Sequence, residues 1–228
     1  MNTIAYSSAH VLTLSLEDTF PEVIPQGITN ICVMIPAGND NVAKKLVDNK
    51  FFFADRTLKT LISLSKIDTT LQKLVRFQII TGAEYTDDIN NIAYIAFSMD
   101  RRFHLKQTYD MDHAKQIIEG YINTAKKLGY PLVTCIYKEK VIGFISLKPE
   151  SDKNYFIYLA AVHPDYQKTG AAVSLYVSAC CHALKLGASQ LTGRISAANT
   201  AVMNIYILLH AKFSEPWDIY LKEMKLSD

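Results

Sequence analysis

The stretch VHPDYQKTGAA, at residues 162–172, decides the fold of this chain. It joins an aliphatic run at residues 155–162, typical of a buried strand, to a long helix with regularly spaced apolar residues. A loop that opens directly into a helix directs consecutive backbone N–H groups and the positive helix end at one point, which suits a pyrophosphate. Gly170, Ala171 and Ala172 are small, so a ligand can approach the backbone closely. The stretch therefore predicts a phosphate-binding strand, loop and helix.

The residues after this loop follow a recognisable order. The loop runs Gln-x-x-Gly-x-Ala from Gln167, and Val-x-Pro precedes it. Downstream, a predicted strand is followed by Asn199, by a helix that contains Tyr206, and by a Lys-Phe pair at residues 212–213. In these respects the chain resembles the GNAT superfamily of acyl-CoA-dependent N-acetyltransferases, whose loop reads Gln/Arg-x-x-Gly-x-Gly/Ala and which usually has Gly-Phe after the last helix. The context carries this resemblance, because a turn of small residues is common by itself.

Apolar periodicity predicts the elements of one catalytic domain over residues 76–228. Strands are expected at residues 77–80, 132–137, 141–147, 155–162, 190–195 and 217–224, and helices at residues 87–98, 111–128, 171–186 and 201–209. This order of strand, two helices, three strands, helix, strand, helix and strand is that of the GNAT fold. The resemblance therefore implies the α+β class, with a mixed central sheet flanked by helices.

The first third of the chain contains a partial repeat of the last third. Residues 35–43 echo residues 195–203, and in both copies the helix is followed by Lys-Phe and a strand. This predicts a degenerate half-GNAT at residues 1–75. Depending on the alignment, the place of Tyr206 falls on Leu46 or Lys44, and no Gln-x-x-Gly-x-Ala loop lies upstream, so we expect this half to bind no acetyl-CoA. The alternative is a chance recurrence of a strand, an Asn cap and a helix.

Composition excludes several classes of function. The 24 basic and 22 acidic residues give a net charge of +2, and no basic run exceeds two residues, so no nucleic-acid partner is expected. No apolar run reaches the roughly 18 residues that span a bilayer, and no secretory signal pattern opens the chain. We therefore expect a cytoplasmic protein with no membrane partner. The four cysteines lack metal spacing, which predicts reduced thiols and no metal site.

The resemblance implies acetyl-CoA as the acyl donor and assigns residues to its parts. In relatives the fourth strand splays from the fifth, and its free backbone groups bind the pantetheine arm and polarise the thioester. By position those groups belong to Ala160, Ala161 and Val162. The pyrophosphate would be held by Gln167, Lys168, Thr169, Gly170, Ala171 and Ala172. Asn199 has two expected roles, as the cap of its helix and as a contact to the coenzyme.

Tyr206 is the expected general acid. A phenol with a pKa near 10 stays protonated at neutral pH and can protonate a departing thiolate, whose conjugate acid has a pKa of about 8.5. Some relatives carry a Glu early on the fourth strand as general base, but residues 155–158 include no carboxylate, so we expect ordered water to take the amine proton. His163 is an alternative base, although a loop histidine is more often solvated or bonded to backbone.

The acceptor is indicated by the stretch SMDRRFH at residues 98–104. It resembles a Ser-Arg-Phe stretch of dTDP-fucosamine acetyltransferase, in a sugar-nucleotide branch that also has a partial N-terminal GNAT half. The resemblance implies an amino-deoxy sugar nucleotide whose diphosphate pairs with Arg101 and Arg102. A solvated Arg-Arg surface is the alternative. Polyamine, antibiotic and protein amines stay open as acceptors. A module that binds acyl-CoA without turnover stays open as an alternative function. A homodimer stays open as the assembly.

Overall fold

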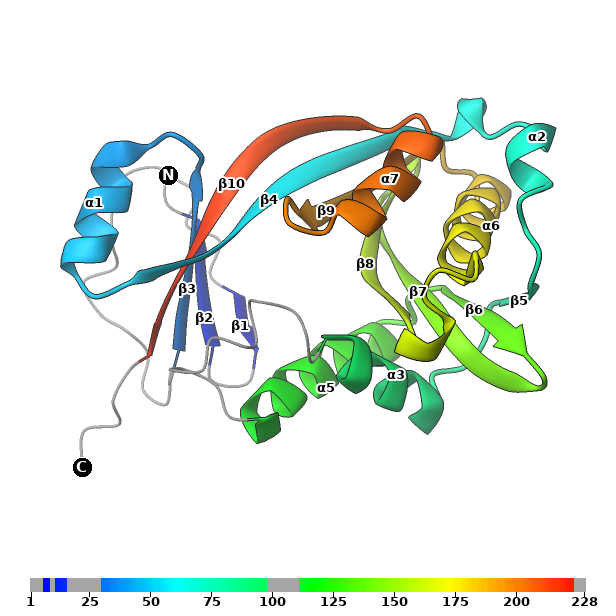
Figure 1. The fold of residues 1–228 in the computed structure, drawn as a ribbon, viewed down its shortest axis with the longest axis horizontal. Helices are drawn as coiled ribbons and strands as arrows, with labels where there is room; N and C mark the ends of the chain where they lie inside the picture. Colours follow the sequence, from blue (N-terminus) through cyan, green and yellow to red (C-terminus); the bar gives the residue numbers. More distant parts are fainter. Residues whose placement is uncertain (1–5, 9–10, 16–29, 98–110, 224–228) are drawn as a thin grey trace.

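The structure, a computed structural model, describes residues 6–8, 11–15, 30–97 and 111–223. These residues form one mixed, ten-stranded sheet in the order β1-β2-β3-β10-β4-β9-β8-β7-β6-β5, with helices packed on it (Figure 1). The strands are β1 (Tyr6–Ser8), β2 (Val11–Ser15), β3 (Asn30–Pro36), β4 (Phe52–Ser63), β5 (Gln78–Thr81), β6 (Leu132–Tyr137), β7 (Lys140–Ser151), β8 (Asn154–Val162), β9 (Gln190–Ser196) and β10 (Lys212–Glu223). The helices are α1 (Asp40–Asp48), α2 (Thr69–Gln72), α3 (Asp87–Phe97), α5 (Met111–Lys127), α6 (Ala171–Lys185) and α7 (Thr200–Leu208), with short 3-10 helices η1 (Leu64–Lys66) and η2 (Pro164–Tyr166).

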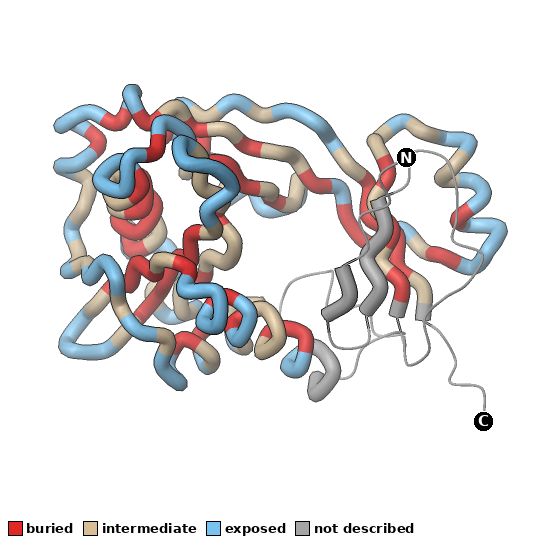
Figure 2. The backbone as a smooth tube through the Cα atoms, turned by 180° about the vertical axis from the view of Figure 1, so that it is seen from behind, coloured by how far each residue is buried: buried red, intermediate tan, exposed pale blue. Residues whose placement is uncertain are grey.

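Helices cover both faces of the part of the sheet formed by β6, β7 and β8. On one face, Leu175 of α6 shares a buried cluster with Val133 and Ile145 of the strands. On the other face, α3 and α5 bury Ile89 and Ile118 in a cluster with Phe144. Strands that are covered on both faces carry apolar residues in succession, which explains the continuous apolar runs in this part of the sequence. Figure 2 shows buried residues concentrated along these strands and α6.

Two long strands join the region before residue 76 to the region after it. Strand β4 pairs antiparallel with β9 on one edge and with β10 on the other, and β3 pairs antiparallel with β10. In Figure 1, β4 and β10 run side by side across the molecule, from α1 at one end towards α2 and α6 at the other. Both edges of β4 are therefore hydrogen-bonded to strands of the region after residue 75. The division into parts at residues 1–75 and 76–228 stays a prediction.

The two strand–helix–strand units, β3-α1-β4 and β9-α7-β10, repeat each other in hydrogen-bonding detail. Asn39 caps α1 by accepting from the Val42 N–H at 3.3 Å, and Asn199 caps α7 by accepting from the Val202 N–H at 3.1 Å. Each unit also donates a backbone hydrogen bond to the second strand of the other unit. The Ala37 N–H donates to the Pro216 carbonyl of β10, and the Ala197 N–H donates to the Arg56 carbonyl of β4.

The ends of α1 and α7 decide the alignment that the sequence left open. Lys50 and His210 follow the helices, and both have positive φ, 67° and 55°. The next N–H, from Phe51, donates to the Leu46 carbonyl, and its counterpart from Ala211 donates to the Tyr206 carbonyl. Leu46 therefore occupies the place of Tyr206 in the N-terminal unit, and the Lys44 alternative is wrong.

The expected elements of residues 76–228 are all present, with shifted ends. Strands β7 and β10 extend further than their apolar patterns predicted, whereas β1 and β2 were not foreseen. Cys32, Cys135, Cys180 and Cys181 form no disulfide bond, and the first and last are only half buried. Within the described ranges, no helix is both long and apolar enough to cross a membrane.

Candidate active site

Strands β8 and β9 separate after a short parallel contact. Their pairing runs from Asn154 opposite Gln190 to Phe156 opposite Thr192, although β8 and β9 both continue beyond this point. The register of β8 against β7 passes over Tyr158, which is the extra residue of a β-bulge. A bulge bends its strand, and in Figure 1 the continuation of β8 turns away from β9. The predicted splay is thus present, with its vertex at the pair formed by Phe156 and Thr192.

The ladder between β7 and β8 decides which backbone groups of β8 face the opening. The His163 N–H donates to the Ile142 carbonyl at 2.8 Å, directly across from it. Because bonded and non-bonded pairs alternate in an antiparallel ladder, Ala161 also directs its N–H and C=O towards β7, whereas Ala160 and Val162 direct theirs towards β9. Of the three residues expected to offer free backbone groups, Ala160 and Val162 have the required orientation and Ala161 does not.

The loop after β8 has the backbone conformation of an anion-binding turn. Lys168 and Gly170 have positive φ values of 68° and 91°, and α6 begins immediately afterwards. The Ala171 N–H donates to the Thr169 Oγ1 at 3.4 Å, and the first backbone hydrogen bond of α6 runs from the Ser174 N–H to the Gly170 carbonyl at 3.0 Å. The preceding N–H groups of Ala172 and Val173 belong to the first helical turn, which lacks intrahelical acceptors. Both amides are therefore available to a bound anion at the positive end of α6.

The space in front of this loop is open. A Cβ added to Gly170 would meet no atom within 4 Å, and the side chains of Gln167, Lys168 and Thr169 are exposed. A hydrogen bond within the loop stabilises its conformation, because the Thr169 hydroxyl donates to the Tyr166 carbonyl at 2.6 Å. A pre-formed loop with free amides, one lysine and no carboxylate between residues 166 and 173 fits the pyrophosphate of coenzyme A.

His163 is engaged by the loop itself. Its Nδ1 accepts a hydrogen bond from the Asp165 N–H at 3.3 Å, so this atom caps η2. This agrees with the expectation of a backbone partner. A base role for Nδ1 would require this bond to break.

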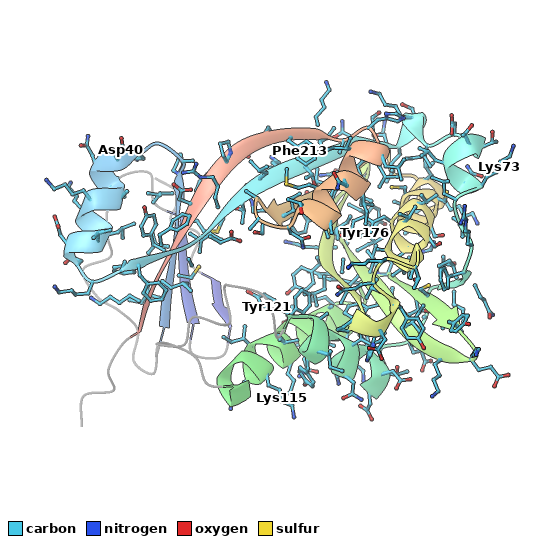
Figure 3. All side chains as sticks on the ribbon, in the orientation of Figure 1. Asp40, Lys73, Lys115, Tyr121, Tyr176 and Phe213 are labelled. Atoms are coloured by element: carbon cyan, nitrogen blue, oxygen red, sulfur yellow. The ribbon has the colours of Figure 1, made fainter. Side chains whose placement is uncertain are left out.

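Tyr206 lies on α7 with its ring enclosed by aromatic neighbours. Its ring centroid is 5.4 Å from that of Tyr176 on α6 and 6.4 Å from that of Phe213 on β10, both with edge-to-face geometry. Figure 3 labels these two neighbours, Tyr176 and Phe213, close to α7. Only 1% of Tyr206 is exposed. Burial raises the pKa of Tyr206, and the hydroxyls of Thr60 and Tyr176 offset part of that rise. The phenol is therefore protonated at neutral pH.

The hydroxyl of Tyr206 points at the vertex of the opening. A Cβ built on Gly193 would lie 2.5 Å from the Tyr206 Oη. Gly193 follows Thr192, the last residue of β9 that pairs with β8. The hydroxyl therefore lies close to the point where the two strands begin to separate. The glycine is required there, because any side chain would occupy the place of the hydroxyl.

For the remaining residues of the expected site, the structure supports only part of the prediction. Asn199 is exposed and caps α7, so its capping role is confirmed, whereas its contact to the coenzyme stays a prediction. Arg101 and Arg102 lie outside the described residues. Sequence reasoning missed Thr60, Tyr176 and Gly193, which surround the Tyr206 hydroxyl. No local pattern marks them, since they come from three different elements.

A cavity of about 550 Å³ opens at the turn between β7 and β8. It is lined by Pro149, Glu150, Ser151, Asp152, Tyr155 and Leu186. The lining comes from the end of β7, the turn, the start of β8 and the residue that follows α6. At this end of β8 the strands β8 and β9 are still paired, so the cavity is separate from the opening and from the loop at residues 167–170.

Comparison with known proteins places the chain in a family. The model of the acetyltransferase (GNAT) family matches residues 87–209, more than half of the chain. The chain therefore belongs to the GNAT acetyltransferase family, which fits its fold, its splayed strands and its loop. A comparison with curated proteins gave no match.

Solved structures show the same fold at low sequence identity. A tandem GNAT protein from the clavulanic acid biosynthesis pathway aligns with a TM-score of 0.58 at 10% identity, over 96% of this chain and 77% of that one. A conserved protein of unknown function from Staphylococcus epidermidis ATCC 12228 gives a TM-score of 0.63 at 13% identity, over 87% and 74%. A putative GNAT acetyltransferase from Novosphingobium aromaticivorans DSM 12444 gives 0.54 at 10%, over 86% and 75%.

Proposed function

We propose that the protein transfers an acetyl group from acetyl-CoA to the nitrogen of a small amine. The observation that carries this proposal is the convergence of three features on one opening: the free edge of β8, the open loop before α6, and the buried Tyr206 hydroxyl at the vertex. Family membership supports acyl-CoA-dependent acetyl transfer. A protein that only binds acyl-CoA has no use for a proton donor at this position.

The residues of the opening divide the reaction between them. The loop at residues 167–172 holds the pyrophosphate, and the edge groups of Ala160 and Val162 bind the pantetheine arm and polarise the thioester carbonyl. A neutral amine attacks that carbonyl carbon, and the carbon–sulfur bond breaks. Tyr206 gives its proton to the departing thiolate. The amine loses its own proton to ordered water, since no carboxylate lies between residues 155 and 158 of β8.

For the acceptor we favour an amino-deoxy sugar nucleotide. The support is the likeness of residues 98–104 to the sugar-nucleotide branch, together with the partial repeat in the N-terminal region. Arg101 and Arg102 would bind the diphosphate of such an acceptor. Polyamines, aminoglycoside antibiotics and peptide amines are the competing acceptors.

The test begins with binding and ends with a panel of amines. Calorimetry should show acetyl-CoA binding to the full chain, and free thiol should then be measured with nucleotide-linked amino sugars, polyamines, aminoglycosides and a lysine peptide. We expect the highest kcat/KM with an amino sugar nucleotide, reduced about tenfold or more by Arg101→Ala with Arg102→Ala. Binding without turnover of any amine would contradict the enzymatic proposal. Turnover of a polyamine alone would contradict only the acceptor.

A further inference from the structure

Thr60 is a buried threonine of β4 that no sequence motif indicated. It is fully buried, and among the described residues its Oγ1 has no hydrogen-bond partner. A buried hydroxyl without a partner costs about 1–3 kcal/mol of stability. An apolar residue such as valine would avoid this cost, so the hydroxyl is expected to have a use outside the folded ground state.

The position of Thr60 is set by the exchange of strands between the two units. Strand β4 pairs with β9 so that Thr60 stands opposite Gly193. The point where a Cβ of Gly193 would stand is 3.0 Å from the Thr60 Oγ1 and 2.5 Å from the Tyr206 Oη. The two hydroxyls therefore border the same small space beneath β9, next to the vertex of the opening.

We propose that Thr60 is a positioning residue for Tyr206, whose hydroxyl donates a hydrogen bond to the Tyr206 oxygen as the proton of that phenol leaves. The inference rests on the proposed function, in which Tyr206 protonates the thiolate. Loss of the proton turns the phenol oxygen into an anion that needs a donor. The Thr60 O–H makes no hydrogen bond to another acceptor in the described part of the chain, so this donor is available to the Tyr206 oxygen. Solvent returns a proton to Tyr206 after the thiol departs.

An interaction of this kind accelerates the reaction because it strengthens as charge develops. In the resting protein the Thr60 Oγ1 does not meet the geometry of an ordinary hydrogen bond, yet it is close enough to lower the pKa of Tyr206. The pair therefore gains more in the transition state than in the ground state. The pKa of Tyr206 agrees with this role. The Thr60 hydroxyl lowers that pKa, as a group that stabilises the phenolate must, although burial raises it by more. Tyr176 also lowers the pKa of Tyr206, but its large ring shapes the pocket as well, which makes Thr60 the cleaner subject for a test.

The inference gives the N-terminal region a part in catalysis. Residue 60 lies outside residues 87–209, which match the family model, and β4 reaches the site only by insertion between β9 and β10. The region that lacks a coenzyme loop of its own would thus complete the acid of the other unit.

The experiment replaces Thr60 by valine, which has nearly the same shape and no hydroxyl. Turnover is measured as thiol release from acetyl-CoA with the best amine of the panel and also with water as the acceptor, since both reactions protonate the same thiolate. We expect Thr60→Val to lower kcat about tenfold, the worth of one hydrogen bond in the transition state, with the KM for acetyl-CoA unchanged. Its thermal midpoint should equal or exceed that of the parent. Thr60→Ser should retain most of the activity.

A double-mutant cycle separates this role from simple packing. In a Tyr206→Phe background, Thr60→Val should slow turnover no further, because the two residues act together. Thr57→Val is the matched control on the same strand, since the Thr57 Oγ1 donates to the Trp217 carbonyl and accepts from Arg194. It should lose stability and keep kcat.

Each outcome decides one of the two proposals. If Thr60→Val turns over within twofold of the parent while Tyr206→Phe is slow, the role of Thr60 is wrong and the acid role of Tyr206 stands. If Tyr206→Phe is itself as fast as the parent, the acid role and the inference fall together. Should Thr60→Val not fold, Thr60→Ala and Thr60→Ser supply the same comparison.

Discussion

The units β3-α1-β4 and β9-α7-β10 share a backbone and differ in chemistry. Both have an Asn cap, a residue with positive φ after the helix, and a second strand paired with the other unit. The N-terminal unit has Leu46 where the C-terminal unit has Tyr206, and no Gln-x-x-Gly-x-Ala sequence precedes it in the chain. A repeated backbone therefore provides a common frame, and under the proposed function a few side chains decide which copy carries the reaction.

The largest expected difference between the units comes from Tyr206. Tyr206→Phe keeps the ring packing and removes only the hydroxyl, so kcat should fall about 10²- to 10⁴-fold while acetyl-CoA still binds. The measurement is single-turnover kinetics, so that product release does not mask the chemical step. Leu46→Phe, at the equivalent place, should leave kcat unchanged. A Tyr206→Phe turnover within about threefold of the parent would make Tyr206 a packing residue only.

Gly170 and Gly38 allow the two units to be compared in their effect on acetyl-CoA affinity. Gly170 and Gly38 have φ values of 91° and 87°, and a Cβ at either meets no atom within 4 Å. Replacement of either by glutamate should cost about 1–3 kcal/mol through backbone strain. Gly170→Glu should in addition weaken acetyl-CoA binding about 100-fold or more, because its carboxylate faces the pyrophosphate. Calorimetry that finds equal affinity in both folded variants would contradict the assignment of the loop.

The two units should contribute differently to the loss of stability at alkaline pH, because the C-terminal unit has the buried Tyr206 where the N-terminal unit has Leu46. The pKa of Tyr206 is raised by burial, whereas a tyrosine of the unfolded chain titrates near pH 10. Above that pH the unfolded chain binds fewer protons than the folded one, so stability is fully present below about pH 10 and is lost as pH rises further. Tyr206→Phe should reduce this slope by up to about 1.4 kcal/mol per pH unit, whereas Leu46→Ile should leave it unchanged. Urea unfolding at several alkaline pH values measures it.

The smallest expected effect is in the helix caps, where the units should behave alike. Asn39→Ala and Asn199→Ala each remove one side-chain hydrogen bond to a helix N-terminus, which should cost about 1 kcal/mol in the free energy of unfolding. The KM for acetyl-CoA should stay constant in Asn39→Ala. A large rise in that KM at normal stability would mean that the N-terminal unit helps to hold the coenzyme.

Much of this architecture is local and could be predicted from the sequence. The loop at residues 167–170 and the start of α6 follow from a strand, a glycine and an apolar period that lie next to one another in the chain. The Asn39 and Asn199 caps follow from side chains that bond to amides three residues away. Tyr206 was singled out because its spacing from Asn199 matches the pattern of the GNAT resemblance, and one short helix, α7, carries it directly after that cap.

Other features depend on which strands meet, and only the tertiary structure decided them. The order β10-β4-β9 brings Thr60 to Gly193 and Tyr206, although Thr60 is far from both in the sequence. The bulge at Tyr158 and the ladder with β7 direct the groups of Ala160 and Val162, and not those of Ala161, into the opening. Strand order and register are set by burial and pairing over the whole sheet, and a one-residue change of register would turn every side chain to the other face. The local sequence therefore indicated Tyr206 and the loop, and the fold determined which residues surround them.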